Sequence, residues 1–244
     1  MARARLSLAL AVIFLLGGAA DLGAELPLDK IKDPQLRARL RTAGLQIFFG
    51  QSTVAMTNAH AIGWEVFHDG KKGRERELAY SVALQGLAEA SLELNREALW
   101  HWSMAQILLP ELQGEVLQAY SGIAELFDSS PYRSRATALD WIEQESRLLT
   151  PGGEFAAPVV IAKGQIPTPQ RKPSALNGQR LTVSFLVDPE GRPYSPVIER
   201  GGKNSLVVFT ALHSVMGWRF EPPRQGDQTG WALSSTIISF ERGK

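Results

Sequence analysis

Apolar and polar residues alternate in one stretch near the C-terminus of this 244-residue chain. Four apolar side chains share one face of the stretch: Leu181, Val183, Phe185 and Val187. A period of two residues predicts a strand with one buried face. The residues from Asp188 to Gly191 predict a hairpin, because Asp, Pro and Gly stand where a β-turn favours them. The return strand contains Pro193 and Pro196, which cannot donate to a sheet ladder, so we expect it at a sheet edge.

A helix follows the hairpin. Apolar residues recur at three- and four-residue steps from Val208 to Trp218, which predicts a helix that Asn204 caps and that Pro222 and Pro223 end. The hairpin and the helix therefore leave one further element to complete a sheet.

The last apolar segment, Trp231 to Glu241, is rich in β-branched and aromatic residues and predicts a third strand. Because the return strand takes one side of the alternating strand, the third strand takes the other side. An edge strand leaves unpaired backbone groups that can accept an extended segment of another chain. We assign the partner-binding edge to Ser235, Ile237, Ser239 and Glu241.

Helical periodicity dominates the region from Leu26 to Leu149. Asp33 and Pro34 provide a helix cap and a first helical residue, so Gln35 to Phe49 is the first expected helix. The second expected helix is Thr53 to His68. Together these elements predict an all-α module ahead of the sheet.

An internal repeat lies within the helical region. Gly86 to Glu89 returns as Gly122 to Glu125, thirty-six residues later. Five repeat-packing residues of the first copy stand at spacings of 12, 4, 3 and 5: Gly86, Ala98, Trp102, Ala105 and Pro110. This spacing resembles the tetratricopeptide repeat, in which small residues let two helices approach closely. We expect Asn95, and Ser130 with Pro131, to cap the second helix of each copy; a generic helical bundle is the alternative.

The run from Trp218 to Pro222, placed after a helix, is the most specific motif of the chain. With it, the region from about residue 165 to residue 241 resembles the C-terminal domain of the TonB family. The residues that carry this resemblance are Gly178, Val187, Asp188, Gly191, Arg192, Ala211, Leu212, Val215, Trp218, Arg219, Phe220, Glu221, Pro222, Gly226 and Phe240. The chain departs from the family where Val208 and Phe209 replace an acidic pair, and no tyrosine–proline pair occurs between Gln165 and Pro173.

The resemblance implies a strand–strand–helix–strand domain that grips a short segment of an outer-membrane receptor by strand addition, in the periplasm of a Gram-negative bacterium. Within this domain, five motif residues are expected to be structural: Gly191, Trp218, Arg219, Phe220 and Pro222. The two aromatic rings are expected to fill the space between helix and sheet rather than to touch a partner.

The N-terminus has the pattern of a secretory signal. Arg3 and Arg5 precede an apolar run from Leu6 to Leu16, and small residues follow up to Ala20. The run is shorter than the roughly 20 residues that a membrane-spanning helix needs. We expect cleavage after Ala20; an uncleaved inner-membrane anchor is the alternative, and only then would the chain contact a membrane. N-terminal sequencing of the exported protein distinguishes a start at Asp21 from an intact terminus.

Charge and composition exclude several classes of partner. The formal net charge is +1 with acidic and basic residues interspersed, so no basic surface for nucleic acid is expected. The chain has no cysteine, which excludes a lipid-modified cysteine, a disulfide and a cysteine nucleophile. Stability must therefore come from packing.

No catalytic or metal motif is evident. The four histidines, His60, His68, His101 and His213, show no ligand spacing beside a carboxylate motif, and the segment Gly201 to Ser205 lacks the spacing of a phosphate loop. We expect no cofactor, no metal and no catalytic residue. A carboxylate or histidine pair buried together in a cleft of the helical module would favour an enzyme instead.

We therefore predict an α+β multidomain chain. Its parts are a signal peptide (1–20), an all-α module similar to tetratricopeptide repeats (26–149), a proline-rich extended linker (150–179) and a TonB-like domain with a three-stranded antiparallel sheet (180–244). The predicted function is non-enzymatic binding of a protein or peptide in the cell envelope. Two alternatives stay open: an anchored TonB-type energy transducer for outer-membrane transport, and a cell-envelope hydrolase with a helical accessory domain.

Overall fold

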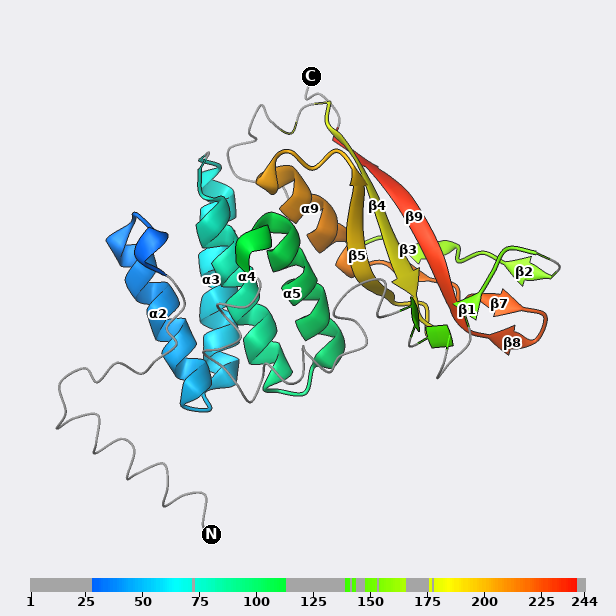
Figure 1. The fold of residues 1–244 in the computed structure, drawn as a ribbon, viewed down its shortest axis with the longest axis horizontal. Helices are drawn as coiled ribbons and strands as arrows, with labels where there is room; N and C mark the ends of the chain where they lie inside the picture. Colours follow the sequence, from blue (N-terminus) through cyan, green and yellow to red (C-terminus); the bar gives the residue numbers. More distant parts are fainter. Residues whose placement is uncertain are drawn as a thin grey trace, which may run out of the picture.

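The computed structural model describes residues 28–71, 73–112, 139–140, 142–143, 148–152, 154–165, 176 and 178–240. The expected signal peptide, Gly122 to Glu125 and Ser130 of the second repeat copy, and Glu241 lie outside the described residues. Helices occupy the first half of the described chain and strands dominate the second half (Figure 1). The predicted α+β class is confirmed.

The helical half contains two short 3-10 turns, η1 (Leu28–Lys30) and η2 (Pro110–Leu112). Between them lie α2 (Pro34–Phe48), α3 (Ser52–Asp69), α4 (Glu75–Ala90) and α5 (Asn95–Leu108). The Asp33 carboxylate accepts hydrogen bonds from two backbone N–H groups of the first turn of α2, so the predicted cap is confirmed. Asn95 does not cap α5: Leu94 holds the cap position, and Asn95 is the first helical residue.

Helices α4 and α5 pack closely at Gly86. A Cβ atom at this position would lie 3.0 Å from the backbone oxygen of Ala98 and 3.2 Å from the backbone nitrogen of Trp102. Ala98, Trp102 and Ala105 are buried in the core, whereas Pro110 is exposed at the start of η2. The absence of a side chain on Gly86 therefore sets the separation of the two helices.

Three long elements form the sheet half: β4 (Arg180–Val187), β5 (Pro193–Arg200) and β9 (Trp231–Ser239). Strand β4 lies between the other two and pairs antiparallel with both, as predicted. The turn between β4 and β5 closes with a hydrogen bond from the Gly191 N–H to the Asp188 carbonyl, and Asp188 also accepts from the Arg192 N–H. The strand order and the hairpin are therefore confirmed.

The sheet has a fourth strand that the sequence did not predict. Leu148 and Leu149, which we expected at the end of a helix, form β1 and pair in parallel with Trp231 and Ala232 of β9. The predicted three-stranded sheet is thus extended by two residues from a distant segment. Helical periodicity could not reveal this pairing, because it depends on a contact across about eighty residues of chain.

Helix α9 (Ser205–Met216) connects β5 to the motif segment. The Asn204 side chain accepts hydrogen bonds from the backbone of Leu206 and Val207, so its predicted capping role is confirmed. The helix ends before Trp218, earlier than predicted. Arg219 and Phe220 instead form the short strand β6.

The region predicted to be an extended linker contributes short strands to the sheet half. Strand β3 (Val160–Ala162) pairs antiparallel with β6, and β2 (Phe155–Ala156) pairs antiparallel with β7 (Arg224–Gln225). Strand β7 forms a small hairpin with β8 (Gln228–Thr229). The described part of this region is therefore docked against the C-terminal residues.

The two halves share one continuous hydrophobic core. In Figure 1, α9 lies between the helical layer and the sheet. The Phe209 ring of α9 lies 5.0 Å from the Phe67 ring and 5.7 Å from the Trp64 ring, both on α3. Val208 and Phe209 at the start of α9 are both buried, so an acidic pair at these positions would lose its hydration.

Candidate functional site

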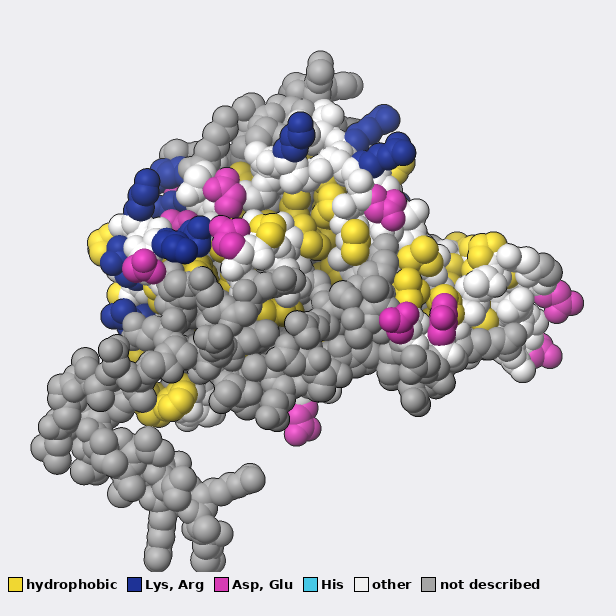
Figure 2. All heavy atoms as spheres, viewed as in Figure 1, with side chains coloured by type: hydrophobic (Ala, Val, Ile, Leu, Met, Phe, Trp, Pro, Cys, Tyr) yellow, Lys and Arg dark blue, Asp and Glu magenta, His cyan; other side chains and the backbone are white. Residues whose placement is uncertain are grey.

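The outward face of β9 carries exposed apolar side chains. Leu233 and Ile237 expose 54% and 62% of their surface, and Ser235 and Ser239 lie exposed between and beyond them. Their partners on β4 are Leu186, Ser184, Thr182 and Arg180, which point to the same side. Leu186 and Ser184 are buried, so the exposed part of this side lies on β9 and at the start of β4. Figure 2 shows hydrophobic side chains at the surface over the sheet half.

On one side of strand β9, the described residues supply few backbone partners. Strand β4 pairs with β9 along eight residues, and β1 pairs only with Trp231 and Ala232 on the other side. From Leu233 to Ser239, no residue that the structure describes pairs with β9 on that side. The edge available for strand addition therefore starts at Leu233, directly after the two residues that pair with β1. Glu241, the fourth residue assigned to it, lies outside the described residues.

The opposite edge of the sheet is different. Helix α5 packs against β5, which is the main contact between helical half and sheet. Strand β5 also contains Pro193 and Pro196, which lack N–H donors. Of the two long edge strands, β9 is therefore the one suited to strand addition.

The motif residues lie inside the junction of helix and sheet. Trp218 is 4% exposed, its Nε1 donates to the Ser214 hydroxyl at 3.2 Å, and Lys163 Nζ lies 5.4 Å from the ring centroid. The Phe220 ring is buried and lies 5.3 Å from the ring of Phe185. These contacts agree with a packing role for both aromatic residues and place neither of them on the β9 edge.

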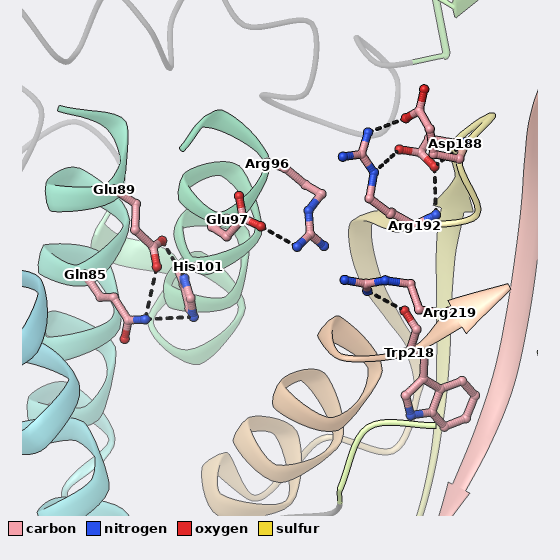
Figure 3. Close-up of polar contacts among 10 residues, drawn as sticks. Gln85, Glu89, Arg96, Glu97, His101, Asp188, Arg192, Trp218 and Arg219 are labelled. Atoms are coloured by element: carbon pink, nitrogen blue, oxygen red, sulfur yellow. Dashed lines mark hydrogen bonds and ion pairs between the residues drawn. The ribbon is translucent and has the colours of Figure 1, made fainter. Parts of the chain in front are cut away.

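Gly191 joins the hairpin to this motif. Its carbonyl accepts a hydrogen bond from the Phe220 N–H, and a Cβ atom on Gly191 would lie 2.0 Å from the Phe220 oxygen. Arg219 is exposed and donates to the Trp218 carbonyl (Figure 3). Pro222 is half-buried. Together, the motif residues fix the hairpin against the end of α9.

The structure brings three of the four histidines, His60, His101 and His213, to one small cavity. His101 of α5 and Glu89 of α4 form a buried pair, with 2.6 Å between His101 Nδ1 and Glu89 Oε2. Gln85 bridges them, donating to Glu89 at 3.1 Å and lying 3.3 Å from His101 Nε2 (Figure 3). His60 of α3 and His213 of α9 line the same small cavity.

Electrostatics keep the histidine on α9 neutral. Burial, reinforced by His101 and His60, lowers the pKa of His213 from 6.5 to about 4. Desolvation also lowers the pKa of His60, which lies at the rim of the cavity, although a hydrogen bond with Gln85 partly opposes this. The sequence held one signal for this cluster: His60, Trp64 and His68 share a helix face at four-residue steps, as do Phe209 and His213.

The histidine cluster has no room for a substrate. The cavity beside it measures about 10 Å³, the space of a single water molecule. Across the described parts of the chain, no three His, Cys, Asp or Glu side chains gather closely enough to hold a metal ion. The buried pair named above as favouring an enzyme is present, and the described cavity beside it has the size of one water molecule.

Comparison with protein families, with curated proteins and with solved structures finds no match to this chain. Within the described residues, no helix combines the length and the apolar character needed to cross a bilayer. The function must therefore be inferred from the geometry of the chain and from the resemblance of its motifs.

Proposed function

We propose that this chain is a non-enzymatic interaction protein of the cell envelope that binds an extended segment of a partner protein along β9. The observation that supports the proposal most directly is the side of β9 from Leu233 to Ser239, which no described residue pairs. A partner strand would obtain main-chain hydrogen bonds from β9, and its alternate side chains would cover Leu233 and Ile237.

Strand β1 supports the same proposal from within the chain. Leu148 and Leu149 already add to this side of β9, so the edge accepts an extended segment at its first two residues. The part of the edge that no described residue pairs continues directly from that pairing. A bound segment would therefore lengthen an existing fourth strand rather than create a new arrangement.

The resemblance to the TonB family suggests an outer-membrane receptor as the partner, and the helical half, similar to tetratricopeptide repeats, would offer a second interaction surface. The energy transducer is the alternative. The docking of α5 and α9 on each other and of α5 on β5 weighs against it, because two halves with a shared core cannot extend across the periplasm on a flexible linker.

The proposed edge can be tested with a defined probe. Peptides that bind the full-length protein would be selected from a phage-displayed library of random nonapeptides, and their affinities measured by calorimetry. We expect Ile237→Lys to weaken binding at least tenfold, because a charge replaces the apolar surface that the peptide covers. Bound peptide should also slow amide hydrogen exchange from Leu233 to Ser239.

Ile161→Lys is the matched control. Ile161 on β3 is 62% exposed, the same fraction as Ile237, but it lies on a different strand. Its replacement should change the affinity less than twofold. Equal losses in both variants, or protection of amides outside β9, would contradict the docking edge, and so would failure to select any binding peptide.

A further inference from the structure

The contact between the helical half and α9 is built around His213. Its ring stacks on Phe209 at 5.6 Å with an interplanar angle of 6°, and it meets Trp64 of α3 edge-on at 5.0 Å. Nδ1 of His213 is buried and has no hydrogen-bond partner among the described residues. A proton added at this nitrogen would therefore place a charge in an apolar contact without an acceptor.

The groups around His213 cannot compensate that charge. His60 from α3 and His101 from α5 act on it, and both disfavour a positive charge on its ring. Glu89 of α4 is already engaged by His101 and Gln85. Within the described residues, β4 and β5, which pack on the other side of α9, contribute no charged group that acts on His213.

We infer that protonation of His213 loosens the packing of α9 against α3 and α5, so that acid weakens the junction between the helical half and the sheet half. The junction is then a pH-sensitive contact. Its opening exposes Phe209 together with the aromatic residues Trp64 and Phe67 that cover it. This inference does not depend on strand addition at β9.

The direction in which pH changes the opening of the junction follows from the pKa of His213 in the closed and open forms. Once the junction opens, the pKa of His213 returns from about 4 toward its ordinary value of 6.5, so the open form binds a proton that the closed form excludes. The contribution of neutral His213 to closure is complete above pH 6.5 and is lost as the pH falls toward 4. Between pH 7.5 and pH 5, the equilibrium constant for opening should rise on the order of 10- to 30-fold.

Hydrogen exchange of the full-length protein measures this opening directly. The protection factors of amides in α9 (Ser205–Met216), corrected for the intrinsic pH dependence of exchange, should fall on the order of 10- to 30-fold between pH 7.5 and pH 5. Amides in α2 and β9, which do not form the junction, should change less than threefold. His213→Phe retains an aromatic ring beside Phe209 but cannot be protonated, and it should abolish the fall.

His68→Phe is the matched control, because His68 stacks on Trp64 in the same aromatic cluster but belongs to α3. This variant should keep the wild-type pH response. The inference would be overturned if the protection of α9 amides in the wild type did not change with pH, or if α2 and β9 lost protection equally. It would also be overturned if the loss persisted in His213→Phe or disappeared in His68→Phe.

Discussion

Replacing Trp218 with alanine is expected to lower the free energy of unfolding by about 3 to 5 kcal/mol, the range for truncating a buried aromatic residue. The indole is 4% exposed and packs beside Phe220, and its Nε1 has a partner in Ser214. Alanine would leave a cavity between α9 and the sheet and would remove that hydrogen bond. Chemical denaturation followed by circular dichroism measures the loss.

Arg219→Ala is the control for the Trp218 variant, because Arg219 is the neighbouring motif residue. Its side chain is exposed, and among the described residues the guanidinium donates to the Trp218 carbonyl alone. We expect a change within about 0.5 kcal/mol, as for most surface substitutions. Equal losses at the two positions would show that the motif does not act by burying its tryptophan.

Local sequence patterns account for much of the sheet half. The alternation from Leu181 to Val187 sets the register of β4, and the turn at Asp188 to Gly191 forces β5 back beside it. The Asn204 and Asp33 caps are also local, since each side chain bonds backbone N–H groups two and three residues later. These elements are predictable because the deciding contacts lie within a few residues.

Contacts between distant segments are not predictable in this way. The pairing of Leu148 with Trp231 and the pairing of Val160 with Phe220 each join residues that are many positions apart. The buried pair of Glu89 and His101 depends on how α4 and α5 pack, which helical periodicity does not specify. Sequence reasoning therefore predicted strand β9, but it missed the pairing of β9 with β1 and the histidine cluster.

One contact between distant segments, the packing of α9 on α3, is indicated by the sequence. Val208 and Phe209 stand where the TonB-like pattern has an acidic pair; both are buried, and the Phe209 ring packs on Phe67 of α3. An apolar residue at a position that an isolated domain would expose to water indicates a second packing surface. Departures from a motif can thus predict a contact even when its partner is unknown.

Replacing Gly191 with alanine is expected to cost about 3 kcal/mol or more of unfolding free energy. The residue has a φ of +76°, which an alanine adopts at a cost of about 1 kcal/mol. In addition, the new Cβ would lie 2.0 Å from the Phe220 oxygen, so either the hairpin or the motif backbone must move. Denaturation of purified protein measures the change.

Gly50→Ala separates the two causes of this loss. Gly50 has nearly the same φ, +73°, but no heavy atom lies within 4 Å of an added Cβ. It should therefore show only the conformational cost of about 1 kcal/mol. If Gly191→Ala lost no more unfolding free energy than Gly50→Ala, the close contact between Gly191 and Phe220 would not contribute to the loss. A clear excess at Gly191 would support the contact through which the hairpin holds β4 and β5 against the Trp218 motif.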